Sequence, residues 1–101
     1  MTDMLDKKYL KTKPVCKVTF IAPSIWDGES IALVGDFNGW NESADPMKRQ
    51  KDGSFKLTLD LETGKEYQFR YLVNNTEWHN DEAADKYVPN GFGEDNSVIV
   101  V

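Results

Sequence analysis

Two tryptophans in this sequence stand where they could bind a ligand. Trp40 follows a glycine-punctuated turn over residues 35–39 and lies close to the amide of Asn38. Trp78 follows a second turn rich in amides, over residues 74–76. A flat aromatic face beside planar amides suits a sugar, because it offers an apolar platform together with fixed hydrogen-bonding groups. The alternative for each ring is packing at the core or its rim, with the indole N–H bonded to water or backbone.

Arg70 and Asn96 extend this set of candidate binding residues. Arg70 alternates with Phe69 and Tyr71, so a strand over this stretch would place its charge on the face opposite the aromatic rings. Taken alone, an arginine at such a position is more often a solvated surface residue. Trp26 precedes a surface turn without amide neighbours, which favours packing or simple exposure.

The sequence offers no arrangement typical of catalysis or metal binding, so we expect no catalytic residue, no metal and no cofactor. His79 is the only histidine, which rules out a multi-histidine metal site. The acidic residues Asp81, Glu82 and Asp85 lack the glycine and spacing of a calcium loop, which favours a solvated connector. A complete barrel hydrolase needs roughly 250 residues, far more than the 101 of this chain.

The composition is that of a globular domain, with 40% hydrophobic and 29% charged residues and a net charge of −5. Five lysines against two aspartates give residues 1–17 a charge of +3, so the remaining residues carry −8. An acidic body argues against nucleic acid as a partner. The absence of a long apolar run and of a signal-peptide pattern leads us to expect a cytoplasmic protein without membrane contact. The single cysteine, Cys16, is expected to be buried.

Hydrophobic periodicity predicts at least five strands, separated by turns roughly every ten residues, and no long helix. The expected strands cover residues 15–22, 30–34, 54–61, 67–73 and 97–101. The strand over residues 30–34 is apolar throughout, so we expect it to be central in its sheet. We expect a loose arm over residues 1–14, a helical turn over 80–85 and a loop over 87–93. This pattern predicts an all-β chain folded as one antiparallel β-sandwich over residues 15–101.

Four ordered motifs in the chain resemble a known family. They are Val34-Gly35-Asp36-Phe37-Asn38-Gly39-Trp40, then Asp52-Gly53-Ser54-Phe55, then Gly64-Lys65-Glu66-Tyr67-Gln68-Phe69-Arg70-Tyr71-Leu72-Val73, and Trp78-His79-Asn80-Asp81. The family is the isoamylase N-terminal (early set) domain, or carbohydrate-binding module family 48. It includes the glycogen-binding domain of the AMP-activated kinase β subunit. The closing run over residues 95–100 looks like that family's final strand, so the resemblance spans about residues 15–101.

The resemblance implies an immunoglobulin-like sandwich of the early set type that binds α-1,4-linked glucans such as glycogen or starch. Members that bind sugar use two tryptophans, a basic residue and an asparagine. Arg70 stands where the kinase domain has a lysine, and Glu94 replaces a threonine. The turn before Trp78 is one residue longer than in the family. The residues expected to bind carbohydrate are Trp40, Trp78, Arg70, Asn96, Asn38 and Phe92.

Three functions follow from these observations as alternatives. The first is a free-standing, non-catalytic module that binds α-glucan by tryptophan stacking. The second is an interaction or packing module that partners a separate glycoside hydrolase family 13 type glucan enzyme, with the tryptophans as interface anchors. The third, a hydrolase in its own right, is disfavoured by the size of the chain. An exposed edge strand would also allow a homodimer.

Overall fold

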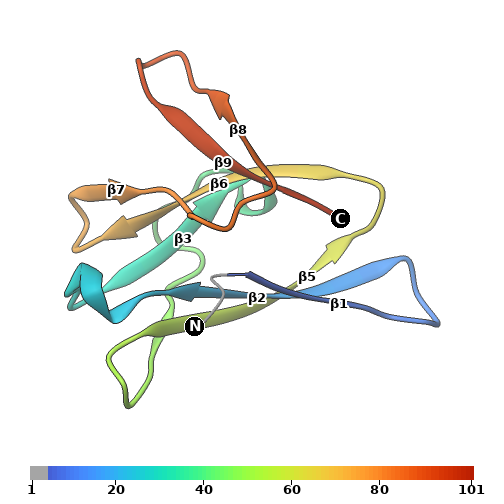
Figure 1. Cartoon of the computed structure of the whole chain (residues 1–101), viewed down its shortest axis with the longest axis horizontal. Coiled ribbons are helices and arrows are strands. Elements are labelled where there is room, and N and C mark those ends of the chain that lie inside the picture. The colour runs from blue at the N-terminus through green and yellow to red at the C-terminus, as the bar shows by residue number, and fades with distance from the viewer. Residues whose placement is uncertain (1–4) are drawn as a thin grey trace.

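Two antiparallel β-sheets packed face to face make up the fold (Figure 1). The computed structural model describes residues 5–101. Within that range, the first sheet has the strand order β1 (Leu5–Tyr9), β2 (Val15–Ala22), β5 (Phe55–Glu62) and β4 (Lys48–Arg49). The second has the order β3 (Ile31–Gly35), β6 (Glu66–Val73), β9 (Asp95–Val100) and β8 (Lys86–Pro89), with β7 (Glu77–His79) also paired to β6. The predicted all-β antiparallel sandwich is confirmed.

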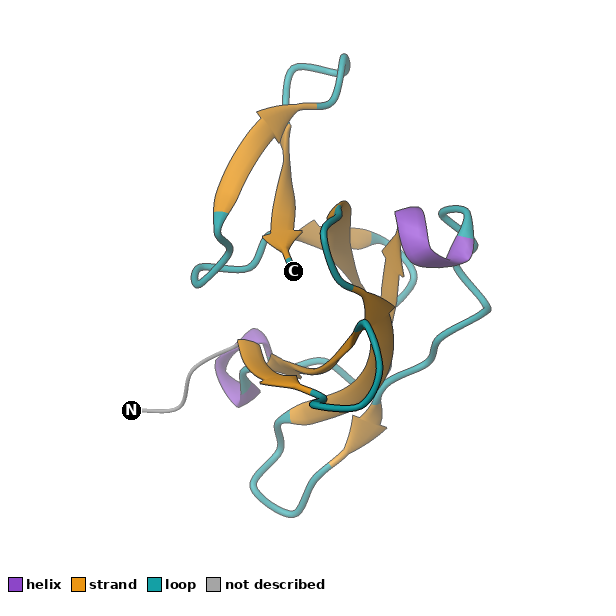
Figure 2. Ribbon diagram, turned by 90° about the vertical axis from the view of Figure 1, so that its right-hand side faces the viewer, coloured by secondary structure: helices purple, strands orange, loops and turns teal. Residues whose placement is uncertain are grey.

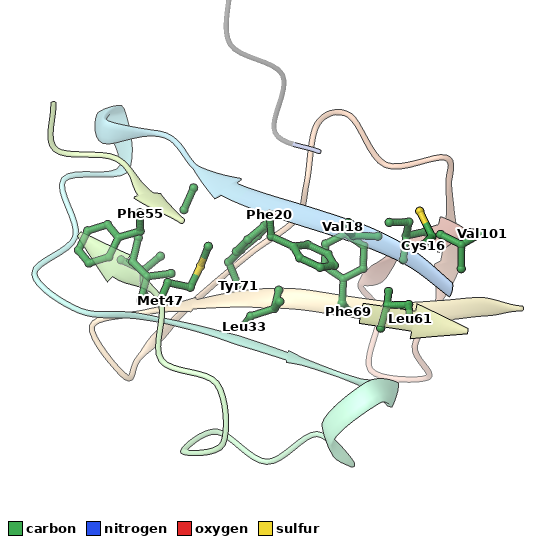
Figure 3. Packing of buried hydrophobic residues seen from close by; sticks show 14 residues of the cluster. Cys16, Val18, Phe20, Leu33, Met47, Phe55, Leu61, Phe69, Tyr71 and Val101 are labelled. Atoms are coloured by element: carbon green, nitrogen blue, oxygen red, sulfur yellow. The ribbon is translucent and has the colours of Figure 1, made fainter. Parts of the chain in front are cut away.

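The core lies between the sheets and is built by alternation along the strands. On β2, the even-numbered residues Cys16, Val18, Phe20 and Ala22 are fully buried, as the sequence pattern predicts. They face the inner residues of β6, including Phe69 and Tyr71 (Figure 3). Burial of each large apolar side chain stabilises the fold by roughly 1.5–3 kcal/mol. Burial also raises the pKa of the Cys16 thiol.

The expected loose arm is wrong for Leu5–Tyr9, which form strand β1 and pair with β2 along their whole length. Residues 1–4 lie outside the described residues. Leu5 packs against the core, and Lys7 Nζ donates to Asp85 Oδ2 at 2.7 Å and to the Val100 carbonyl at 3.0 Å. These contacts tie β1 to the other sheet. This strand could not be predicted from hydrophobic periodicity, because the segment contains few apolar residues and many lysines.

Strand β3 lies at the edge of its sheet, so the expectation that it is central is wrong. Its apolar character has another cause, since residues 45–47, which follow the turn that carries Trp40, cover its free edge. The Leu33 N–H donates to the Asp45 carbonyl at 2.9 Å, and the Met47 N–H donates to the Ile31 carbonyl at 2.8 Å. Met47 is buried, as expected for the inward contact of this segment, whereas Pro46 is exposed.

Two further expectations differ from the structure near the C-terminus. The predicted loop over residues 87–93 begins as strand β8, which pairs with β9 and continues into a hairpin loop. Figure 1 shows this hairpin projecting beyond the body of the sandwich. Residues 80–85 form a turn and no helix. In the described part of the chain, the helical segments are the short 3-10 turns η1 (Ser24–Trp26) and η2 (Asp36–Asn38) (Figure 2).

One edge of β6 changes its partner halfway along the strand. Residues Glu66–Phe69 pair with β9, and residues Tyr71–Val73 pair with β7. Arg70 lies at the junction and has no register partner on that side among the described residues. The opposite edge of β6 pairs with β3. Strand β6 therefore connects the segments that carry Trp40, Trp78 and Asn96.

We predict that Gly35→Ala lowers the free energy of unfolding by about 1–3 kcal/mol, the usual cost of overpacking. A Cβ at Gly35 would lie 2.5 Å from the Gln68 carbonyl oxygen and 2.8 Å from Phe69 Cβ. Urea unfolding measures the change. Gly64→Ala is the control, because its surroundings are open and only its φ of +78° opposes a side chain, at a cost of about 1 kcal/mol. Equal losses for the two variants would contradict the close packing at Gly35.

Candidate carbohydrate-binding site

The turn after β3 holds the Trp40 ring in a fixed position. Gly39 and Trp40 both adopt left-handed backbone, with φ of 66° and 60°. The Trp40 N–H donates to the Gly35 carbonyl at 2.9 Å, and its indole N–H donates to Asp36 Oδ1 at 2.9 Å. The other oxygen of Asp36 accepts the Gln68 N–H at 2.8 Å, which joins the turn to β6. Left-handed backbone costs a residue with a side chain roughly 1–2 kcal/mol, so the surrounding contacts must maintain it.

The side chain of Phe37 provides the inward anchor of this turn, as predicted. It packs against the core, with ring centroids 5.7 Å from Phe20 and 6.4 Å from Phe69.

The prediction that Asn38 contacts the ligand is not supported by its position. Its Oδ1 accepts the Gly35 N–H at 3.1 Å, and its Nδ2 donates to the Leu33 carbonyl at 2.9 Å and to Asp45 Oδ2 at 2.7 Å. The amide is therefore engaged in holding the turn together. Sequence alone does not distinguish an amide that shapes a turn from one that faces a ligand, because asparagine serves both purposes.

Arg70 lies beneath Trp78 and is far less exposed than expected for the outer face of a sheet. Its side chain is 9% exposed, and its guanidinium carbon lies 5.7 Å from the centroid of the Trp78 ring. Its Nη2 donates to Glu94 Oε2 at 3.2 Å. The buried Nε–H has no hydrogen-bond partner within the described residues. A buried donor left unpaired is costly and calls for a partner.

Trp78 and His79 point to opposite faces of β7, because side chains alternate along a strand. Trp78 is 37% exposed on the outer side of β7. His79 stacks on Trp26, with ring centroids 4.5 Å apart, and Trp26 also packs on Tyr71. Trp26 is therefore a packing residue. The sequence had favoured either packing or simple exposure for this side chain.

The amide of Asn96 joins a chain of polar side chains on the same face. Its Nδ2 donates to Gln68 Oε1 at 3.1 Å, and its Oδ1 accepts from Asn90 Nδ2 at 3.4 Å. At the end of the β8–β9 hairpin, Phe92 is 88% exposed. Asn90 holds the backbone of this loop, since its Oδ1 accepts the Phe92 N–H at 2.8 Å.

These side chains surround one open cavity of about 460 Å³, within the usual size range of ligand sites. The residues that line it are Trp40, Gln68, Arg70, Trp78, Asn90, Phe92, Glu94 and Asn96. Five of the six predicted binding residues thus meet in one place, and Asn38 does not. The sequence reasoning missed Gln68, Asn90 and Glu94 as lining residues, since Glu94 was noted only as a departure from the family. Gln68 could have been found from its period-two spacing to Arg70, but Asn90 depends on the unpredicted hairpin.

A buried polar cluster behind the cavity holds the segment after Trp78 in place. Ser97 Oγ accepts the Asp81 N–H at 2.8 Å and donates to Asn80 Oδ1 at 2.9 Å. The Tyr71 hydroxyl donates to Asp81 Oδ2 at 2.7 Å, and the Tyr87 hydroxyl donates to the Asp81 carbonyl. Asp81 is fully buried, so the expected solvated acidic connector is wrong at this residue.

Burial raises the pKa of the Asp81 carboxyl, and the negative charges of Glu82 and Asp85 act in the same direction. The hydrogen bonds from Tyr71 and the Ala83 N–H oppose this shift without cancelling it. The pKa of Asp85 itself lies below its ordinary value. Burial acts to raise it, but the hydrogen bonds from Lys7 and the Val100 N–H together outweigh that effect.

Among residues 5–101, no group of three His, Cys, Asp or Glu side chains could hold a metal ion. No helix in the same range is long and apolar enough to cross a membrane. The cavity offers three aromatic side chains, three amides and one ion pair. These groups can stack on sugar rings and exchange hydrogen bonds with hydroxyls.

A β-sandwich with such an aromatic and amide-lined cavity has the features expected of a carbohydrate-binding module. The chain belongs to the family described as the glycogen recognition site of AMP-activated protein kinase, whose model matches residues 23–101. This confirms the resemblance found in the sequence motifs. The family is one of non-catalytic binding domains.

Curated relatives contain similar segments within much longer chains. The chain is 33% identical, across 97% of its length, to the chloroplastic phosphoglucan phosphatase LSF1 of Arabidopsis thaliana, of which it covers 16%. It is 31% identical, across 66% of its length, to the 1,4-alpha-glucan branching enzyme GlgB of Aquifex aeolicus, of which it covers 11%. A branching enzyme of Xanthomonas campestris, GlgB 2, is 37% identical over 50% of this chain, which covers 7% of that protein. The chain thus spans less than a fifth of each of these relatives.

We predict that Asp81→Asn becomes more stable relative to the unchanged protein as the pH rises from about 4 to 7. Because the folded state raises the pKa of Asp81, the folded state holds the proton more tightly than the unfolded chain. Stability from this group is therefore lost as the pH rises through the folded pKa. An asparagine does not titrate and avoids that loss. Urea unfolding of both proteins at the two pH values measures the difference.

Asp85→Asn is the matched control, for which we expect the opposite trend with pH. The pKa of Asp85 is lowered in the folded protein, so its carboxylate contributes stability above the ordinary pKa. That stability is lost as the pH falls through the folded pKa. The Asp85→Asn variant should therefore lose stability relative to the unchanged protein as the pH rises. The same trend for both variants would contradict the assigned directions.

Proposed function

We propose that this module binds α-1,4-linked glucan in the cavity by stacking glucose rings on Trp40 and Trp78, without catalysing a reaction. The observation that carries the proposal is the meeting of two tryptophans from distant parts of the chain in one cavity beside Arg70 and Asn96. Two separated aromatic platforms suit a chain of linked sugars better than a single small ligand. Asn96 and Gln68 supply amides that can orient hydroxyl groups.

Two local features support a binding role for this cavity. Trp40 is kept in left-handed backbone, and strain of this kind concentrates at functional sites. The Nε–H of Arg70 is a buried donor without a partner in the described part of the chain, and an unpaired buried donor of this kind calls for an explanation. Packing alone would not require either feature.

The expected affinity is modest. Each stack of a tryptophan on a pyranose ring buries on the order of 50–80 Å² of apolar surface, worth roughly 1–2 kcal/mol. Two stacks with charge-assisted hydrogen bonds give a Kd of about 10 μM to 1 mM after the cost of ordering. Such a module becomes effective when a long polymer engages many copies or a tethered neighbour.

The names of the relatives suit an α-glucan ligand, since they include branching enzymes of 1,4-alpha-glucan and a phosphoglucan phosphatase. We therefore also propose cytoplasmic action beside a glucan-metabolising enzyme. Self-association through the free edge of β1 is a further possibility of the fold.

A protein-binding role is a second candidate, favoured by the exposure of Phe92 at 88% and Trp78 at 37%. A pull-down that retains a glucan enzyme and survives Trp78→Ala, but fails when a different face is altered, would support that role instead of sugar binding.

We predict that Trp40→Gly and Trp78→Ala each weaken binding of maltoheptaose by about five- to thirtyfold, the value of one lost stack. Glycine is chosen at position 40 because it tolerates the left-handed backbone there, so the ring is removed without added strain. Isothermal titration calorimetry measures the change for each variant.

Tyr9→Ala serves as the control, because it removes an exposed aromatic ring that lies outside the cavity and should leave the affinity unchanged. No heat or tryptophan fluorescence change in the unchanged protein up to roughly 10 mM maltoheptaose would refute glucan binding at the proposed affinity.

A further inference from the structure

The cavity contains one charge of each sign, and the two differ in exposure. Among the described lining residues, Arg70 and Glu94 are the charged ones. The side chain of Arg70 is 9% exposed, whereas that of Glu94 is 57% exposed. A ligand that enters from solvent therefore meets the carboxylate first. The guanidinium behind it is already paired to that carboxylate at 3.2 Å.

Among the described residues that line the cavity, no second cation offsets the exposed carboxylate. Behind the wall, Asp36 accepts from Trp40 and from the Gln68 N–H, and so adds a further negative charge close to the cavity. The chain beyond its lysine-rich first 17 residues carries a net charge of −8. The potential at the cavity entrance is therefore neutral to negative, which disfavours an anion.

We propose that Glu94 makes this cavity selective for uncharged stretches of α-glucan over stretches that carry a phosphate monoester. The inference rests on the proposed function and specifies the ligand of that same site. A phosphate monoester carries about −1.5 to −2 charges at pH 7. To reach Arg70 it must displace Glu94, or else remain beside the exposed carboxylate. The first arrangement breaks the ion pair between Arg70 and Glu94, and the second places two negative charges together. An unpaired charge and a like-charge contact are both effective means of rejecting a wrong ligand.

A neutral glucose unit meets no such barrier. Its hydroxyls can donate to Glu94, because an ionised carboxylate is a pure acceptor. Other hydroxyl oxygens can accept from the Arg70 guanidinium, which lines the cavity and is a pure donor. The ion pair thus presents both kinds of hydrogen-bonding group to a sugar without a net charge.

The same geometry predicts that removing Glu94 reverses the preference. Without its counter-ion, the Arg70 guanidinium would be a planar, permanently charged hydrogen-bond donor beneath Trp78. Such a group matches the geometry of phosphate oxygens and binds them through charge-assisted hydrogen bonds. Glu94 therefore determines whether Arg70 serves a neutral or an anionic ligand.

The test compares maltoheptaose with the same oligosaccharide carrying one phosphate monoester, by isothermal titration calorimetry. We expect the unchanged protein to bind the phosphorylated ligand about tenfold more weakly at low salt, and the difference to shrink at high salt. In Glu94→Gln, both absolute affinities can change because Glu94 lines the cavity, but the phosphorylated ligand should bind as tightly as the neutral one or more tightly.

Asp60→Asn is the matched control. It removes one negative charge from an exposed position on β5, in the other sheet, and should leave the preference intact. Circular dichroism verifies folding of each variant, and Glu94→Thr replaces Glu94→Gln if the latter does not fold.

Equal or tighter binding of the phosphorylated ligand by the unchanged protein would overturn the selectivity. So would a preference for the neutral ligand that persists in the Glu94 variant. Failure of the unchanged protein to bind either oligosaccharide would instead refute the proposed function itself.

Discussion

The change of partner along one edge of β6 is the constraint on which the binding face depends. Because β9 pairs with the first half of that edge and β7 with the second, Asn96 and Trp78 flank the same short stretch around Arg70. The Trp40 turn reaches this stretch from the opposite edge, through Asp36 and the Gln68 N–H. Segments far apart in the sequence therefore converge on a few residues of one strand.

The change of partner along β6 leaves Arg70 without a register partner on that edge among the described residues, and the buried polar cluster connects the diverging segments. Where β9 and β7 diverge, two side chains bond to backbone groups. Asn80 Nδ2 donates to the Asp95 carbonyl, and Ser97 Oγ accepts the Asp81 N–H. A buried carboxylate is disfavoured by desolvation, and the raised pKa of Asp81 records that penalty. A well-packed apolar group could stabilise the domain more, but it would not fix the direction of the segment after Trp78 through hydrogen bonds.

The sequence predicted those parts of the structure that depend on local alternation. The inner faces of β2 and β6 and the anchor Phe37 followed from period-two patterning and turn residues. So did Trp40, Arg70 and Trp78 in the cavity, whereas Phe92 was predicted from the family resemblance. The errors arose where a tertiary contact overrides the local pattern. Strand β1 is recruited by Lys7 and pairing with β2, and β3 looks central because a distant segment covers its edge. The structural use of Asn38 could not be known without its three partners.

The two sides of the cavity differ in stiffness, and that difference suits a repetitive ligand. Trp40 is held by its backbone N–H and by its indole N–H, so little rotational freedom remains to be lost when a sugar stacks on it. Phe92 lies instead on a hairpin loop between two glycines of left-handed backbone, with its ring almost fully exposed. In the proposed binding mode, the Trp40 platform fixes where one glucose unit binds, and the exposed Phe92 ring on its projecting loop can meet the next unit over a range of positions. A polymer of identical units presents this combination at every step along its length, whereas a small ligand of fixed shape would gain nothing from the adaptable side.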